Sequence, residues 1–267
     1  MYARITVPTD GSSAALRALP PARGLASAFD CSVELVRVAP PGSADTTTPH
    51  PELDVPARVL EGEDVATALV ADATGQEPPA LLCASTHGRG GFGELVFGGV
   101  ARTLLRRPAQ SMVVVGPSVR PDPPGPLHRA VLCLDGSPTA ESIVRLVREW
   151  AGRRHLEIRV LHVAPPLPGP REGDFSVSEE TRAAADRVDV VVAALHEAGV
   201  RAQGTTVEGA DVPDAIVDHA WWVRADLIAM ATHGHSALRR ALVGSVTDGV
   251  VRTSHVPVLL RRPEQLR

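Results

Sequence analysis

Apolar positions follow two patterns along the chain, short continuous runs and longer segments with helical spacing. In the second half, runs rich in Val, Ile and Leu predict strands, and the segments between them space apolar residues three and four positions apart, as helices do. The predicted strands are 129–134, 156–163, 201–207, 226–231 and 256–261, and the predicted helices are 138–152, 177–198, 211–223 and 244–254. This alternation predicts an α/β fold with a doubly wound parallel sheet, covered by helices on both faces.

The same pattern occurs twice. Four stretches recur in the same order, and they pair ITVPTDGSSAA with VLCLDGSPTAE, VELVRVAPP with EIRVLHVAPP, LEGEDVATALV with VEGADVPDAIV, and LLCASTHG with LIAMATHG. A single DG or THG would indicate only an ordinary turn. Because all four occur in register, the sequence predicts two tandem copies of one domain, each with a five-stranded parallel sheet.

A proline-rich segment separates the two copies. GPSVRPDPPGPLHR at 116–129 contains five prolines, which suit a linker and suit neither a helix nor a strand. We predict a first domain at 1–122 (copy one), a linker at 123–128 and a second domain at 129–267 (copy two).

The copies differ in length between their second and third strands. From the Asp of DG to the Gly of THG, copy one spans 88 − 10 = 78 residues and copy two spans 234 − 135 = 99 residues. The additional residues of copy two carry the helical pattern SVSEETRAAADRVDVVVAALHEAG, where copy one has the polar PGSADTTTPHPELDVP. We therefore expect the first domain to be shortened, with its second helix missing.

Composition and charge narrow the class of protein. The chain has 267 residues, a net charge of −4 and only 3% aromatic residues. A nucleic-acid backbone is a poor partner for such a chain, because phosphate neutralisation needs clustered Lys and Arg. No apolar run approaches the roughly 20 residues of a membrane span, and the start lacks the basic-then-apolar pattern of a secretory signal. We expect a cytoplasmic protein without nucleic-acid or membrane partners.

Other residues favour structural roles. The three cysteines are far apart and form no CxxC pair, which is typical of reduced core thiols. His233 and His235 are too sparse for a metal site, so no metal ligand is assigned. Trp221 and Trp222 end a predicted helix and are expected to be packing residues, one of them between the copies.

Glycine spacing indicates an anion site in each copy. The glycine of THG follows a strand, and a second glycine opens a helix ten residues later: Gly88 and Gly98 in copy one, Gly234 and Gly244 in copy two. Glycine lets the backbone approach a ligand closely, and the free N–H groups at a helix start attract phosphates. Phosphate oxygens are therefore the expected ligands.

Further candidates lie at the ends of the first two strands. Asp10 and Asp135 follow the first strand of each copy, and Val38 and Val163 end the second. Ligands of open parallel sheets collect outside the carboxyl ends of the strands. There a carboxylate can accept a hydrogen bond from an adenine amino group or a ribose hydroxyl, and a valine can form an apolar wall for a base. Capping of the following helix is the alternative role for the aspartates.

These features resemble the universal stress protein family over nearly the whole chain. The family pattern is a glycine, two residues, a glycine, nine residues, and a glycine followed by Ser or Thr. Copy two reads Ala231-Thr-His-Gly234, nine residues, Gly244-Ser245-Val246-Thr247, and then VVRTSHVPVLLRR, so only the first glycine is replaced. Copy one departs further, with Ser85 at the first glycine and Gly99 in place of the hydroxyl-bearing residue.

The resemblance implies a Rossmann-like fold of the adenine nucleotide alpha hydrolase-like type that binds ATP, or AMP or ADP, with Mg²⁺ as an accompanying ion. It implies that adenine lies near Asp135 and Val163, and phosphates near Gly234, Gly244, Ser245 and Thr247. The copy-one equivalents are Asp10, Val38, Gly88, Gly98 and Gly99. It also implies intramolecular pairing of the two final strands, SMVVVGP and VPVLLRR, about a pseudo-twofold axis, with a homodimer left open.

Three functions stay open from the sequence. The favoured one is a stress-response regulator that binds an adenine nucleotide and performs no rapid catalysis, so no catalytic residue is assigned. The second is a scaffold that binds no nucleotide, in which the weakened motifs of copy one are relics. The third is an enzyme such as a slow ATP hydrolase, for which only the repeated Asp and His are candidate bases.

Overall fold

The computed structural model describes residues 1–43, 50, 52–75, 77–86, 97, 99–105, 111–120, 127–137, 140–166, 179–232 and 244–262. In copy one these residues form β1 (Arg4–Pro8), α1 (Ser13–Leu16), α2 (Leu19–Phe29), β2 (Ser32–Ala39), β3 (Ala57–Glu61), α3 (Val65–Thr74), β4 (Ala80–Ser85), α4 (Gly99–Leu105) and β5 (Ser111–Val115). In copy two they form β6 (Arg129–Leu134), α5 (Glu141–Arg154), β7 (Glu157–Ala164), α6 (Glu179–Glu197), β8 (Ala202–Glu208), α7 (Val212–Trp222), β9 (Leu227–Ala231), α8 (Ser245–Thr253) and β10 (Val258–Arg261).

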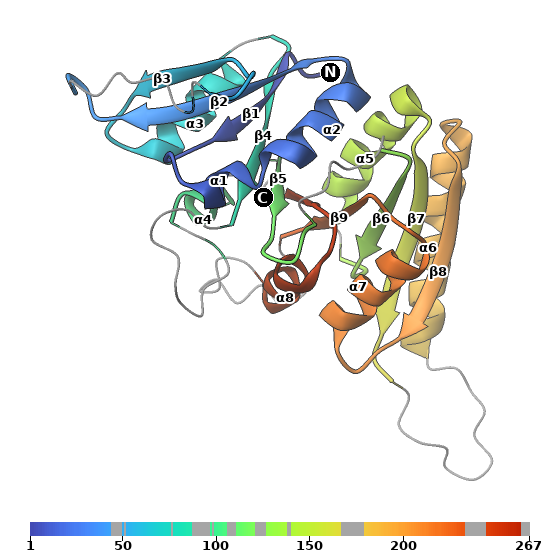
Figure 1. Ribbon diagram of the computed structural model, residues 1–267. Helices are drawn as coiled ribbons and strands as arrows, with labels where there is room; N and C mark the ends of the chain where they lie inside the picture. The colour runs from blue at the N-terminus through green and yellow to red at the C-terminus, as the bar shows by residue number, and fades with distance from the viewer. Residues whose placement is uncertain are drawn as a thin grey trace, which may run out of the picture.

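All of these strands belong to one sheet, in the order β3-β2-β1-β4-β5-β10-β9-β6-β7-β8 (Figure 1). Neighbouring strands are parallel within each copy, and the strand order of copy two mirrors that of copy one. The two final strands pair antiparallel, with Val114 of β5 opposite Val258 of β10. The two predicted five-stranded parallel sheets are therefore confirmed, and the predicted pairing of their final strands joins them into one.

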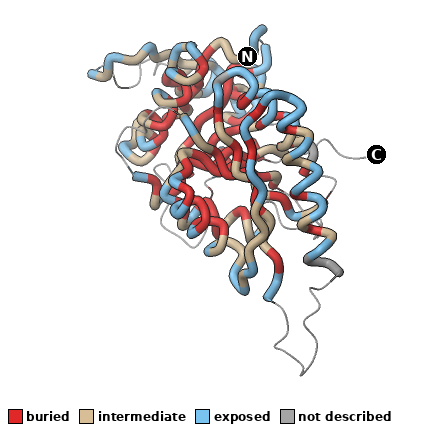
Figure 2. The backbone as a smooth tube through the Cα atoms, turned by 90° about the vertical axis from the view of Figure 1, so that its right-hand side faces the viewer, coloured by how far each residue is buried: buried red, intermediate tan, exposed pale blue. Residues whose placement is uncertain are grey.

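Helices cover both faces of this sheet and separate two apolar layers. Successive strand residues point to opposite faces, so Leu132 belongs to the layer under α2, α5 and α6, whereas Val131 belongs to the layer under α3, α4, α7 and α8. The buried residues run through the middle of the molecule, inside the exposed outer turns of the helices (Figure 2). Cys83 lies in the first layer, where burial raises the pKa of its thiol to about 12.

The predicted elements of copy two are all present, with ends within three residues of the predicted ones. In copy one, the described residues between β2 and β3 contain no helix, as expected. Leu53 and Val55 pack against the core there, on the sheet face that α6 helps to cover in copy two. The predicted linker at 123–128 lies mostly outside the described residues, so the domain boundaries stay a prediction.

Three aromatic rings join the copies beside the sheet. Trp150 of α5 packs edge-on against Phe29 of α2 and against Tyr2, with ring centroids 4.7 Å and 6.1 Å away. Its indole N–H donates a hydrogen bond to the Tyr2 hydroxyl at 3.3 Å. Burial raises the pKa of Tyr2 to about 12, against a smaller opposite effect of this hydrogen bond. These residues form one buried contact between the two halves of the chain.

Trp221 and Trp222 are not buried packing residues, but Trp221 does make the expected contact with the other copy, through Arg120. Their exposed fractions are 58% and 78%, whereas Trp150 is 1% exposed. Trp221 lies near the end of α7, beside the Arg120 guanidinium at 4.9 Å from the ring centroid and the His255 ring at 5.5 Å. Helical periodicity alone could not show this, because Ala220 and Val223, on either side of the two tryptophans, are buried.

Ion pairs also link α3 to the sheet in copy one. The Asp72 carboxylate is 2.8 Å from Arg4 and 2.5 Å from Arg58, and both arginines also contact Glu34, at 3.0 Å and 2.7 Å. Burial opposes ionisation of Asp72, but the hydrogen bonds from Arg58 and Arg4 outweigh it and lower the pKa of this carboxyl group. The matching position of copy two is His219, whose pKa is lowered by burial and then by the charge of Arg159.

Candidate functional site

Three adjacent strands of copy two bring their carboxyl ends to the same level. The registers of β6 with β7 and of β6 with β9, continued past the last paired residues, place Asp135 level with Val163 and Thr232. Asp135 is exposed, Val163 is half-buried and Thr232 is buried. The sequence-predicted Asp135 and Val163 therefore lie together at the carboxyl edge of the sheet, where ligands of this fold class bind.

The aspartate of each copy forms a turn with the serine two residues later. In copy two, Asp135 Oδ1 accepts hydrogen bonds from the Ser137 backbone N–H at 3.0 Å and from its hydroxyl at 2.6 Å. Gly136 between them has a φ of 77°, which glycine adopts without strain. Both of these hydrogen bonds end on Oδ1, and among the residues that the structure describes none donates a hydrogen bond to Asp135 Oδ2, which leaves this oxygen to a ligand.

In copy one, the capping alternative for the aspartate is correct in an indirect form. In copy one, Asp10 Oδ1 accepts from the Ser12 N–H at 2.9 Å and from its hydroxyl at 2.5 Å. It is Ser12 that caps α1, because its hydroxyl oxygen accepts a hydrogen bond from the Ala15 N–H at 3.2 Å. The aspartate orients the capping serine and leaves the helix start to that serine.

Gly209, which follows the third strand of copy two, lies beside Val163. The Gly209 N–H donates to the Ala164 carbonyl at 3.0 Å, which draws the β8–α7 turn over the end of β7. A Cβ at Gly209 would lie 3.2 Å from Val163 Cγ1 and 2.8 Å from Ala215 Cβ, so only glycine fits without a shift. This turn and Val163 together provide an apolar wall beside Asp135.

The start of α8 carries three residues of the anion site predicted for copy two, namely Gly244, Ser245 and Thr247. Gly244 is the N-cap residue, and its N–H lies 3.4 Å from the Thr232 carbonyl oxygen, which brings the helix start to the level of the three strand ends. Ser245 is exposed at the first helical position, whereas Thr247 is 3% exposed. The N–H groups of the first turn have no partner within the helix and carry its positive dipole end.

Thr232 is a site residue that the sequence reasoning missed. It stands in the repeated THG motif, in which only the histidine and the glycine were weighed. The residue is 1% exposed, and its hydroxyl makes no hydrogen bond to any residue in the described part of the chain. A buried hydroxyl without a hydrogen-bond partner is costly. The sequence signal that could have identified Thr232 was the repeat of this threonine at Thr86.

Three of the predicted glycines lie outside the described residues, namely Gly88, Gly98 and Gly234. The described part of copy one still repeats the geometry, because the registers place Asp10 level with Val38 and Thr86. Gly99 begins α4, which has seven residues, whereas α8 has nine. The two copies therefore share the strand-end arrangement and differ at the helix start.

One carboxylate lies close to the helix start of copy two. Asp248 is in the first turn of α8, and burial raises its pKa, partly offset by the positive charges of Arg252 and Arg102. The sequence match places Arg102 of copy one at the equivalent position. The charge of this position is thus opposite in the two copies.

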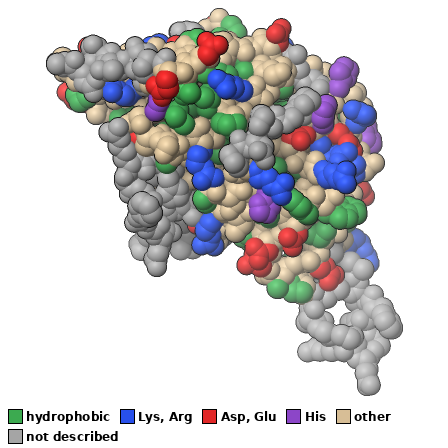
Figure 3. Space-filling model, in the orientation of Figure 1, with side chains coloured by type: hydrophobic (Ala, Val, Ile, Leu, Met, Phe, Trp, Pro, Cys, Tyr) green, Lys and Arg blue, Asp and Glu red, His purple; other side chains and the backbone are tan. Residues whose placement is uncertain are grey.

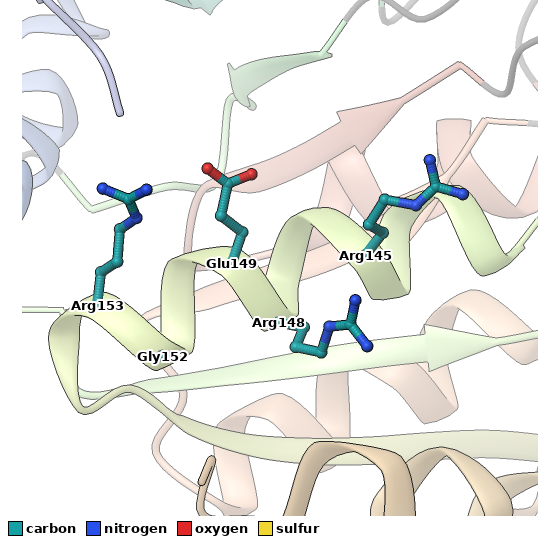
Figure 4. A pocket seen from close by; sticks show the side chains of 5 residues that line it. All are labelled: Arg145, Arg148, Glu149, Gly152 and Arg153. Carbon is teal, nitrogen blue, oxygen red and sulfur yellow. The ribbon is translucent and has the colours of Figure 1, made fainter. Parts of the chain in front are cut away.

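The hollow on the outer face of α5 is separate from these residues (Figure 4). Its volume is about 350 Å³, and it is lined by Arg145, Arg148, Glu149, Gly152 and Arg153. All of its side chains come from one exposed helix face, and none is a predicted site residue. Spacing of four residues places Glu149 between Arg145 and Arg153, the arrangement of a solvated helix surface.

Among the helices of the described ranges, none combines the length and the apolar character that a membrane crossing needs. Within the same ranges, no cluster of three or more His, Cys, Asp or Glu side chains is placed to hold a metal ion.

Known proteins provide an independent comparison. The chain is 26% identical over 197 residues to a universal stress protein of Mycobacterium tuberculosis, a match that covers 68% of this chain and 61% of that relative. It therefore spans less than two thirds of that relative's length. A universal stress protein of Methanocaldococcus jannaschii is 30% identical over 147 residues, or 51% of this chain and 84% of the relative.

The fold is also shared with a solved structure. A universal stress protein from Archaeoglobus fulgidus DSM 4304 superposes with a TM-score of 0.67 at 16% identity, and the match covers 100% of this chain and 99% of that one. The model of the universal stress protein family matches residues 126–262, which is more than half of the chain and contains all of copy two from β6 to β10. The chain belongs to the universal stress protein family.

Proposed function

We propose that copy two binds an adenine nucleotide, with ATP as the first candidate, and that the chain acts as a stress-response regulator without rapid catalysis. One observation carries the proposal: Asp135, Val163 and Thr232 end three neighbouring strands at one level, and the start of α8 meets Thr232 there. This edge combines a carboxylate oxygen, an apolar wall and a set of N–H donors, which are the groups that a nucleotide needs.

Each residue has a defined role in this proposal. Asp135 Oδ2 accepts from the ribose or from the adenine amino group, while Val163 and the Gly209 turn pack against the base. The N–H groups at the start of α8 and the Ser245 hydroxyl donate to phosphate oxygens. Mg²⁺ bound with the nucleotide would neutralise part of the phosphate charge. Gly234 and Thr247, implied by the family resemblance, complete the proposed phosphate site.

The conformation of Gly244 and the free space around it favour a ligand at the start of α8. Its φ of −62° and ψ of 151° are open to any residue, and a Cβ there would meet no described atom closer than the Thr232 oxygen at 3.6 Å. By contrast, a Cβ at Gly249 would lie 2.6 Å from Pro213 Cγ, so packing alone requires that glycine. The described part of the chain does not itself demand glycine at 244, and close approach of a phosphate supplies the reason.

Copy one is the weaker candidate and supports the scaffold alternative for its own half. The seven residues of α4 begin with Gly99, without the hydroxyl that Ser245 provides in copy two.

Regulation would follow if the nucleotide binds one arrangement of the copies better than another, since a ligand shifts an equilibrium only through such a difference. A cytoplasmic location and slow ATP hydrolysis are compatible with this proposal, and so is a homodimer.

The experiment is a measurement of bound small molecules. The purified full chain is denatured, and the released compounds are identified by mass spectrometry; ATP is then titrated calorimetrically into the stripped protein. We expect close to one equivalent of adenine nucleotide per chain, bound at copy two. Two equivalents would add copy one as a second site, and the absence of both ligand and binding heat would favour the scaffold alternative.

A further inference from the structure

The guanidinium group of Arg187 lies against the Asp135–Ser137 turn of copy two. A Cβ built at Gly136 would lie 2.8 Å from its Nη2, 2.9 Å from its Nε and 3.1 Å from its Cζ. These three short distances show that the guanidinium lies directly over the Gly136 backbone. Any larger residue at 136 would displace it, in addition to straining the backbone at a φ of 77°.

Arg187 reaches this turn from α6, and the described residues between β2 and β3 of copy one contain no matching helix. It lies in the middle of α6, and side chains of a helix lean toward the helix N-terminus. Because α6 follows β7, its N-terminus points to the carboxyl edge of the sheet. The long side chain therefore carries its charge from the middle of α6 to the edge where Asp135 lies, and the described part of copy one offers no matching helix between β2 and β3.

Several carboxylates lie at or near the carboxyl edge of the copy-two sheet. Asp135 follows β6, Glu208 ends β8, Asp211 caps α7 and Asp248 lies in the first turn of α8. Acidic side chains gather at the lower end of copy two over the start of α7 (Figure 3). In the described part of the chain, Arg187 forms no ion pair with any of these carboxylates. A polyanion can bind to such an edge only where a cation balances the carboxylates.

We propose that Arg187 contacts the α-phosphate of the bound nucleotide and makes copy two the high-affinity site of the chain. The inference rests on the proposed nucleotide function and adds a residue to it. The inference takes the ribose, one of the two groups proposed above for Asp135, as the partner of that carboxylate; the α-phosphate adjoins the ribose and then lies within reach of the guanidinium over Gly136. A guanidinium offers paired N–H donors that match phosphate oxygens, which a lysine cannot reproduce.

The test compares three ligands on four proteins. ATP, AMP and adenosine are titrated calorimetrically into the wild-type chain and into Arg187→Gln, Arg187→Lys and Arg201→Gln. Gln keeps most of the side-chain length without the charge. Arg201 is the matched control, because it is an exposed arginine just before β8 and thus at the opposite edge of copy two. Thermal unfolding of each variant checks that it folds.

We expect Arg187→Gln to weaken ATP and AMP binding about tenfold, Arg187→Lys to weaken it less, and Arg201→Gln to leave it unchanged. Adenosine binding should change less than twofold in all variants, because adenosine has no phosphate. Wild-type affinity for ATP in Arg187→Gln, or an equal loss for adenosine, would overturn the inference while the proposed function stands. If the wild-type chain binds none of the three ligands, both the proposed function and this inference are wrong.

Discussion

At the scale of single residues, some glycines are required by the packing of their neighbours, whereas another leaves space that a ligand can use. Gly116 and Gly249 are fixed by neighbours, because a Cβ would lie 1.8 Å from the Val251 carbonyl oxygen at the first and 2.6 Å from Pro213 at the second. Gly244 has room for a side chain within the described part of the molecule. Glycine thus allows close packing at 116 and 249 and leaves space for a ligand at 244, and substitutions can distinguish these two roles.

We expect Gly244→Val to weaken ATP binding by at least tenfold, about 1.4 kcal/mol or more, because the side chain occupies the space of a phosphate. Its free energy of unfolding should stay close to that of the wild-type chain. Gly249→Val is the matched control: overpacking against Pro213 should cost about 1 to 3 kcal/mol of stability. Calorimetric titration and urea unfolding measure the two effects. Unchanged ATP affinity in Gly244→Val would refute the site assignment.

At the scale of secondary-structure elements, buried charges fix α3 against the sheet. Asp72 of α3 receives arginines from β1 and β3, and its side chain is only 9% exposed. A charge that is buried with its partners becomes costly when one partner is removed. The α7 helix of copy two, which carries His219 at the matching position, is held without such a carboxylate.

Asp72→Asn should lower the free energy of unfolding by about 2 kcal/mol at pH 7, because Arg4 and Arg58 then lose a charged partner. The sign of the pH dependence follows from the lowered pKa of Asp72. Its contribution is fully present above the unfolded pKa of about 3.9 and is lost as the pH falls through the lower folded pKa. The difference between wild type and variant should therefore shrink at acid pH. Urea unfolding at several pH values measures this.

The control for that variant is Asp218→Asn, which removes an exposed carboxylate from α7. A change within about 0.5 kcal/mol is expected for such a surface substitution. Equal effects of the two substitutions would show that the ion pairs of Asp72 do not stabilise α3.

Most elements could be predicted from the sequence, because buried parallel strands are continuous apolar runs and the repeat gave each run a second example. The candidate site could be predicted only in part. Asp135 and Val163 follow from strand ends, but Thr232 needed the registers that put it level with them. Arg187 gave no signal at all, since a single arginine in a predicted helix has no pattern until Gly136 is seen beneath it. Trp150 was missed because its partners, Tyr2 and Phe29, lie in the other copy.

At the scale of the whole molecule, the copies are held together by the β5–β10 pair and by the aromatic contact of Trp150. Trp150→Ala should lower the free energy of unfolding by about 3 to 5 kcal/mol, because it leaves a cavity between the copies. Trp222→Ala, at a side chain that is 78% exposed, should change it by less than about 0.5 kcal/mol. Urea unfolding followed by circular dichroism compares them. Similar losses in both variants would contradict the assigned contact.

The antiparallel β5–β10 pair has a further consequence for how this protein can change over time. Two separate subunits part on dilution, so their stability depends on their abundance, whereas two copies on one chain stay at a fixed effective concentration. In a symmetric homodimer every substitution also appears twice. Here each substitution alters one half alone, so α4 can begin with Gly99 while α8 begins with Ser245. The covalent tandem thus frees one half to diverge without depriving the other of its partner.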